Sequence, residues 1–109
     1  MANTFKLKTK ANVGVTTVGI YTAPAETKTV VIGITMANTS GSGVNVGVGI
    51  TRAGTTEDVK LLKNAPIPQG SSLEFMAGNK IVLEATDTVT VDSDTNNSVD
   101  AALTIMEIT

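Results

Sequence analysis

Alternating apolar residues in the stretch from residue 28 to residue 52, KTVVIGITMANTSGSGVNVGVGITR, constrain the fold of this chain more than any other feature. A period of two in hydrophobicity is typical of a β-strand, because successive side chains leave opposite faces of the pleat. The short polar segment from Asn38 to Gly43 separates two such runs. We therefore predict a long antiparallel hairpin with one buried face. The predicted buried residues are Val30, Ile32, Ile34 and Met36 in the first run and Val44, Val46, Val48 and Ile50 in the second.

Shorter runs of the same kind occupy most of the remaining chain, and turn-forming residues separate them. The strands predicted outside the hairpin span residues 4–10, 13–22 with a bulge near Val18, 57–64 with Val59 and Leu61 inside, a segment around Leu73 and Phe75 that ends at 77–79, segments around Ile81 and Val89, and 99–108. The predicted connections include an extended segment at 65–70. No run has the period of an amphipathic helix. The pattern predicts an all-β, single-domain antiparallel β-sandwich of about eight or nine short strands over residues 1–109, either immunoglobulin-like or jelly-roll-like.

Histidine and cysteine are both absent from the 109 residues, so the usual general base, the thiol nucleophile and the commonest metal ligands are missing. The net charge is only −2 and the lysines lack interleaved aromatic residues, so we expect no nucleic-acid partner. No apolar stretch is long enough to span a bilayer, and the amino end lacks the apolar segment of a signal peptide. We therefore predict a soluble, non-enzymatic protein, made in a cytoplasm, with no cofactor and no membrane partner.

The segment Asp92-Ser93-Asp94-Thr95-Asn96 places oxygen ligands at alternate positions, as the start of a calcium loop does. It lacks the glycine and the bidentate glutamate that complete such a loop. Aspartate and asparagine are also the ordinary residues of turns. We interpret residues 92–98 as a plain polar loop, too hydrophilic to be buried, and predict no metal site. Glu74 and Glu84, the other acids with a conceivable catalytic role, alternate with apolar residues and are expected on exposed strand faces.

The amino-terminal strand combines an apolar face with a basic one. Phe5 and Leu7 are expected to point inward and the alternating lysines outward. The strand is interpreted as an edge strand whose charges discourage unwanted pairing, or as an arm that docks on an acidic neighbour. The segment from residue 84 to residue 107 contains six acids and no Lys or Arg, so the two could meet within one domain or between copies. The candidate protein–protein contact residues are Phe5, Lys6, Leu7, Lys8 and Lys10.

The opening TFKLKTKANVGVTTVGIYTAPAETKTVVIGITMANTSGSGVNVGVGIT resembles small β-rich virion proteins of tailed bacteriophages. The later stretch KNAPIPQGSSLEFMAGNKIVLEATDTVTVDSD and the ending LTIMEIT are similar to the same group. The resemblance implies a structural protein that is made in the host cytoplasm and incorporated into the virion. Its partners would be the major capsid protein or other virion proteins. It carries over no functional residue.

Three functions remain open from the sequence. The first is a homo-oligomeric capsid decoration or cement protein that bridges neighbouring shell subunits. The second is a head–tail connector, neck or tail structural protein. The third is a carbohydrate- or cell-surface-binding β-sandwich, which would need calcium or an exposed aromatic platform. Tyr21 is the one aromatic residue expected to provide such a platform, because Phe5 and Phe75 are expected to face inward.

Overall fold

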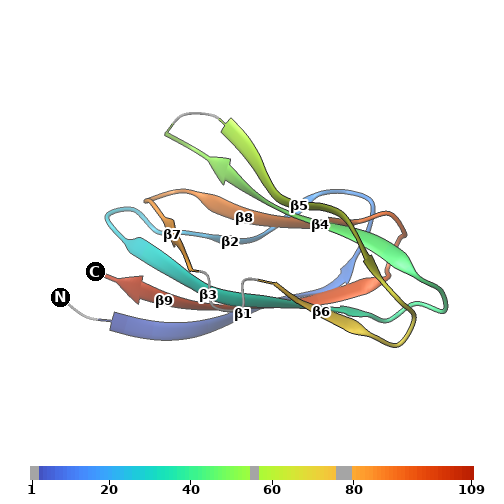
Figure 1. Cartoon of the computed structure of the whole chain (residues 1–109). Helices are drawn as coiled ribbons and strands as arrows, with labels where there is room; N and C mark the ends of the chain where they lie inside the picture. The colour runs from blue at the N-terminus through green and yellow to red at the C-terminus, as the bar shows by residue number, and fades with distance from the viewer. Residues whose placement is uncertain (1–2, 55–56, 76–79) are drawn as a thin grey trace.

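The computed structural model describes residues 3–54, 57–75 and 80–109, and it places nine strands in two packed antiparallel sheets (Figure 1). Sheet A contains β1 (Asn3–Val13), β9 (Val99–Ile108), β3 (Lys28–Asn38) and β6 (Ser72–Phe75) in that order, with β7 (Ile81–Leu83) also paired to β3. Sheet B contains β2 (Val18–Thr22), β8 (Thr88–Ser93), β4 (Val44–Arg52) and β5 (Glu57–Ile67). The prediction of an all-β antiparallel sandwich is confirmed. The described residues contain no helix, and so none that could cross a membrane.

The strand order identifies the sandwich as a jelly roll. Successive strands pass back and forth between the sheets, and β4–β5 is the one pair of consecutive described strands that hydrogen-bond to each other. An immunoglobulin-like sandwich would instead pair several consecutive strands within one sheet. The order β1-β9-β3-β6 facing β2-β8-β4-β5 is that of two intertwined Greek keys.

The predicted hairpin between residues 28 and 52 is wrong, although both of its strands exist. β3 belongs to sheet A and β4 to sheet B, so the polar loop crosses from one layer to the other. The Asn38 side chain supports this crossing, because its Nδ2 donates to the carbonyls of Ser42 (2.8 Å) and Ile67 (2.9 Å). Its Oδ1 accepts from the backbone N–H of Ser40 at 2.9 Å. The two apolar faces therefore pack against each other across the core.

The predicted inner face of β3 is wrong for the first half of the strand, because the strand contains a bulge. The pairing of β3 with β9 shifts between Val31 and Gly33, and an extra residue in one strand moves the following side chains to the opposite face. Val31 is buried before the bulge, and Ile34 is buried after it. Val30 and Ile32, both predicted to be inside, are half-buried on the outer side. The predicted inner face of β4 contains no such error, since all four of its residues are buried.

The predicted strand at 13–22 is two strands. β1 ends at Val13 and β2 begins at Val18, and Val15 is exposed between them. The register of β2 against β8 shifts between Gly19 and Tyr21, slightly later than the predicted bulge.

β5 continues through the segment predicted to be a connection. Asn64 adopts a left-handed φ of 55° within the strand, and the strand ends at Ile67, whose side chain is buried. Pro66 is tolerated because β5 is an edge strand. Val59, predicted to be inside, is exposed, and Figure 1 shows this end of β4 and β5 extending away from sheet A. The predicted strand end at 77–79 lies outside the described residues.

Candidate interaction surface

The side chains of β1 point in the opposite direction to the prediction. Lys6 lies opposite Ile105 and Lys8 opposite Leu103, two fully buried residues of β9. Residues directly opposite in an antiparallel pair share a face, so the lysines lie on the inner side of sheet A. Phe5 and Leu7 consequently lie on the outer side, where they are 69% and 64% exposed. The expectation that Phe5 and Leu7 face inward is therefore wrong.

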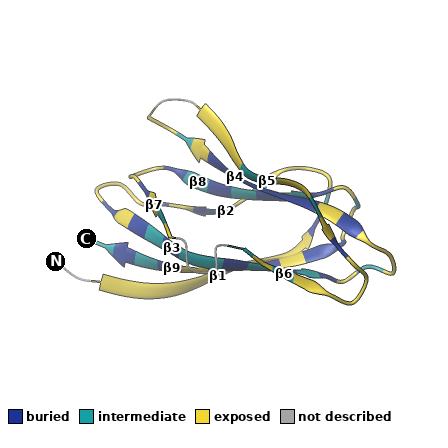
Figure 2. Ribbon diagram, viewed as in Figure 1, coloured by how far each residue is buried: buried dark blue, intermediate teal, exposed yellow. Residues whose placement is uncertain are grey.

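The orientation of β1 is wrong in the prediction because it follows from the pairing of β1 with β9. Every second residue of β9 from Val99 to Glu107 is buried, as the alternation predicts. β1 follows the register that its backbone hydrogen bonds impose, and it contributes one buried residue, Val13. Figure 2 shows β1 exposed along nearly its whole length. An edge strand whose charged side chains point inward is a recognised protection against indiscriminate pairing.

An apolar row crosses the outer side of sheet A. Phe5 lies opposite Met106, Met106 opposite Val30, and Val30 opposite Val82, so the row runs across β1, β9, β3 and β7. Val82 is 57% exposed, and Met106 and Val30 are half-buried. We call the outer side of sheet A the A face; besides the row, its apolar residues are Leu7, Ile32 and Ile108.

A shallow hollow of about 230 Å³ lies beside the row on the A face. Gly33 contributes to it because it has no side chain, and an added Cβ would meet its nearest atom, the carbonyl oxygen of Phe75, only at 3.9 Å. The hollow is lined by Ile32, Gly33, Ile34, Thr35, Glu74, Phe75 and Thr104. The A face thus carries both protruding apolar side chains and a depression.

The outer side of sheet B, which we call the B face, is polar. Its equivalent row runs across β2, β8, β4 and β5 through Thr22, Thr88, Thr51 and Asp58. A hydrogen bond of 2.9 Å joins the hydroxyls of Thr22 and Thr88. A polar groove on the same face is lined in part by Asn45, Lys60 and Asp92.

A buried polar cluster anchors the edge of sheet A from inside. The Tyr21 hydroxyl donates to Glu107 Oε2 at 2.6 Å and lies 2.8 Å from Thr29 Oγ1. Lys6 Nζ forms an ion pair with Glu107 Oε1 at 3.0 Å. Tyr21 is only 7% exposed, so the expectation that its ring offers a sugar-binding platform is wrong. The basic strand and the acidic segment therefore meet within one domain, at least through Lys6 and Glu107.

The same cluster shifts two pKa values. Burial, followed by the hydrogen bond to Glu107, raises the pKa of Tyr21 to about 12. Hydrogen bonds from Tyr21 and then from Lys6 lower the pKa of Glu107. A buried carboxylate is tolerated here because donors satisfy both of its oxygens.

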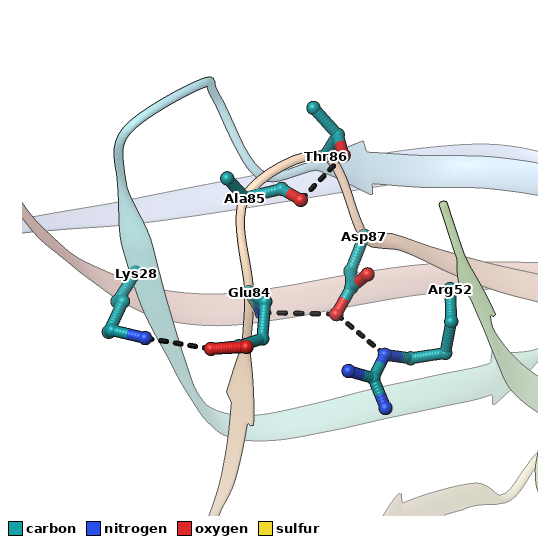
Figure 3. Close-up of polar contacts among 6 residues, drawn as sticks. All are labelled: Lys28, Arg52, Glu84, Ala85, Thr86 and Asp87. Atoms are coloured by element: carbon teal, nitrogen blue, oxygen red, sulfur yellow. Dashed lines mark hydrogen bonds and ion pairs between the residues drawn. The ribbon is translucent and has the colours of Figure 1, made fainter. Parts of the chain in front are cut away.

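The turn before β8 joins sheet A to sheet B through four charged residues (Figure 3). Asp87 Oδ2 accepts from the backbone N–H of Glu84 at 3.0 Å and lies 3.0 Å from Arg52 Nε. Glu84 is paired with Lys28 at 2.7 Å, and this hydrogen bond lowers the pKa of its carboxyl. Glu84 is exposed, as predicted, and its partner is a structural cation on β3.

The acidic loop at 92–98 does not collect its carboxylates into one site. Asp92 accepts from Thr17 Oγ1 at 3.0 Å, whereas Asp94 accepts from the backbone N–H of Asn45 at 3.1 Å. The part of the chain that the structure describes contains no group of three or more acids placed to hold a metal ion. The expectation that the loop is wholly unburied is wrong, since Ser93 and Ser98 are buried and their hydroxyls lie 2.7 Å apart.

The structure thus divides the candidate contact residues between two sides of one strand: Phe5 and Leu7 are on the A face and the lysines are behind it. Sequence reasoning missed Met106, Val30 and Val82 as their neighbours. A signal for Met106 existed, because apolar residues interrupt the polar side of the alternation in residues 99–108.

No family model matches the chain, and no curated protein matches its sequence. Among solved structures, it is similar to a chain from the disulfide-linked pili of Bacillus endospore appendages, with a TM-score of 0.57 and 16% identity over 99% of this chain and 87% of that one. It is similar to a chain of the infectious bursal disease virus particle, with a TM-score of 0.59 and 13% identity over 96% of this chain and 30% of that one. It is also similar to a chain of the cyanophage Pam1 capsid asymmetric unit, with a TM-score of 0.55 and 17% identity over 95% of this chain and 85% of that one. These likenesses establish a shared fold.

Proposed function

We propose that this chain is a non-enzymatic structural subunit of a bacteriophage virion, and specifically a capsid decoration or cement protein. The observation that carries the proposal is the A face, an apolar surface on a domain whose own core is complete without it. Monomeric soluble proteins rarely leave large contiguous apolar patches uncovered, and such patches mark contact sites.

The size of the structural neighbours favours an accessory subunit. The chain corresponds to most of a small chain in the cyanophage capsid asymmetric unit, but to less than a third of the infectious bursal disease virus chain. The pilus neighbour belongs to a disulfide-linked assembly, whereas this chain has no cysteine with which to make such a link. The resemblance of the sequence to small β-rich virion proteins of tailed bacteriophages also supports a virion subunit.

Apolar burial would supply most of the attachment energy. Covering side chains such as Phe5 and Leu7 contributes about 1.5 to 3 kcal/mol each. The lysines of β1 lie on the inner side of sheet A, and an exposed ion pair that one of them made with a neighbour would add only about 0 to 1 kcal/mol. The contact would be weak for one copy and effective when symmetry repeats it over a shell.

Quantitative mass spectrometry of purified phage particles tests the proposal. We expect the chain at a copy number comparable with that of the major capsid protein. We also expect the phage head to remain intact when the chain is detached. A copy number that matches a single ring would favour the head–tail connector, neck or tail alternative. Absence from the particle would remove the proposal. A glycan array tests the carbohydrate-binding alternative. Tyr21, the aromatic residue expected to provide a sugar-binding platform, is buried.

A further inference from the structure

We propose that two copies of this chain pack A face against A face about a two-fold axis. The inference rests on the proposed function, because it names the first neighbour that the A face meets in an assembly. The shape of the face, its charges and its area support this contact.

The shape of the A face is self-complementary. Leu7 and Phe5 protrude from β1, and the hollow at Gly33 lies two strands away on β3. A two-fold axis that brings Leu7 of one copy over the hollow of the other brings the second Leu7 over the first hollow. One pair of features therefore makes two identical contacts, as an isologous interface requires.

The charges favour this arrangement over pairing between edges. If the β1 strands of two copies extended one sheet, the lysines would share a side and lie across from one another, and like charges placed opposite are destabilising. The A face avoids this repulsion between lysines, because the lysines of β1 point to its inner side and its own exposed acids are Glu74 on β6 and Asp100 on β9. Lys28, on its border, is already paired with Glu84.

The area of the face is sufficient for a specific dimer. Sheet A has three long strands, β1, β9 and β3, of 11, 10 and 11 residues, and two short ones, β6 and β7, of 4 and 3 residues. At about 3.4 Å per residue and about 4.8 Å between strands, they give a face of about 600 Å² per copy, or about 1,200 Å² in total. This lies at the lower limit for specific interfaces, which is about 1,000 to 1,200 Å². A ring would need a second, different patch. The described equivalent row on the B face is polar, so the two-fold contact is the one that the chain supports.

Sedimentation equilibrium of the purified full chain tests the inference with three variants. Leu7→Glu removes the protruding side chain, and Gly33→Val fills the hollow at a position with room for a Cβ. Thr22→Glu is the control, since it adds the same charge to an exposed residue on the edge strand of the B face. We expect the wild type and Thr22→Glu to form a dimer, and both A-face variants to raise its Kd about tenfold or more. Circular dichroism must show that all variants remain folded, and a second A-face variant, Val82→Glu, replaces any that does not.

A wild type that stays monomeric at about 1 mM, the weak end of specific association, overturns the inference. So does a dimer that the A-face variants leave intact, or one that Thr22→Glu disrupts equally. Addition of the same proteins to phage particles stripped of the chain separates this failure from failure of the proposed function. A monomer that rebinds particles, and loses rebinding with Leu7→Glu, would assign the A face to the shell protein. A dimer that neither rebinds nor occurs in particles would leave the inference standing and remove the proposed function.

Discussion

The two outer faces of the sandwich are built from equivalent strands but from different side chains. Across sheet A the row reads Phe5, Met106, Val30 and Val82, whereas across sheet B it reads Thr22, Thr88, Thr51 and Asp58. Both faces lie outside the same core, so the core does not require either composition. The polar face is what a solvated sheet surface needs. The apolar one is the surface that the proposed contact between copies would cover.

The two faces also differ in the space around their glycines. Gly33 on the A face has room around it. On the B face, an added Cβ at Gly49 would lie 2.9 Å from the carbonyl oxygen of Val59, and one at Gly47 would lie 2.5 Å from Asp92 Oδ1. The glycines of β4 therefore allow β5 and β8 to approach closely, whereas Gly33 leaves a hollow that a partner can occupy.

The largest expected effect comes from placing the same methyl group on each face. Gly49→Ala should lower the free energy of unfolding by about 3 kcal/mol, because the atom it meets belongs to the backbone and cannot rotate away. Gly33→Ala should change it by less than about 1 kcal/mol and in the stabilising direction, because alanine restricts the unfolded chain. Urea denaturation of the two variants measures the difference. Equal destabilisation would contradict the contrast between the faces.

Tyr21→Phe tests the cluster that holds the edge of the A face from behind. Loss of the hydrogen bond to the Glu107 carboxylate should cost about 1.5 to 2 kcal/mol at neutral pH. The pKa of Tyr21 is raised from 10.0 to about 12, so its stabilising contribution is complete below pH 10 and is lost as the pH rises through 12. Between pH 10 and pH 12, the melting temperature should therefore fall more steeply with pH for the wild type than for the variant. Parallel curves would show that Tyr21 does not titrate in this way.

Deletion of residues 1–10 removes Phe5 and Leu7 from the A face and makes the two faces more alike. The described part of this segment supplies no buried side chain, so we expect the truncated domain to fold with a loss of about 1 to 2 kcal/mol, mainly from packing on β9 and the ion pair with Glu107. Association should weaken far more than when Lys6, Lys8 and Lys10 are changed to glutamine. Circular dichroism and sedimentation velocity measure the two effects. A truncated chain that is unfolded would show that β1 completes the sandwich.

The smallest effect is expected from Lys6→Gln, which changes the inner side of β1 alone. The lysine side chain is 41% exposed, so its ion pair with Glu107 contributes about 0 to 1 kcal/mol. The pKa of Glu107 is lowered from its ordinary value of 4.5, so this contribution is complete above pH 4.5 and is lost as the pH falls through the lowered pKa. The stability difference between the wild type and the variant should therefore disappear in acid. A difference that persists at low pH would assign the effect to packing of the lysine stem.

Much of the strand content was predictable, and so was the inner face of β9, where the alternation of Ala101, Leu103 and Ile105 is uninterrupted. The hairpin was not, because neighbouring strands usually pair and nothing local distinguishes a turn within a sheet from a crossing between sheets. The Asn38 amide supports the crossing by a hydrogen bond to Ile67, far along the chain. The amphipathic character of β1 was also predictable, but the predicted orientation of its two faces was reversed.

The sequence by itself determined most of the strand segments, how their side chains alternate, and that histidine and cysteine chemistry is unavailable. In β1 and β3, only the tertiary structure decided which of the two alternating faces is inside, because both faces of each strand carry side chains that can be exposed or covered. In β3 a single bulge changed which side chains point inward. In β1, which contributes little to the core, the hydrogen-bond register against β9 determined which side chains point inward. The apolar row is the clearest case, since Phe5, Val30, Val82 and Met106 come from four separate segments. Long-range strand pairing brings them together, and no local pattern encodes that pairing.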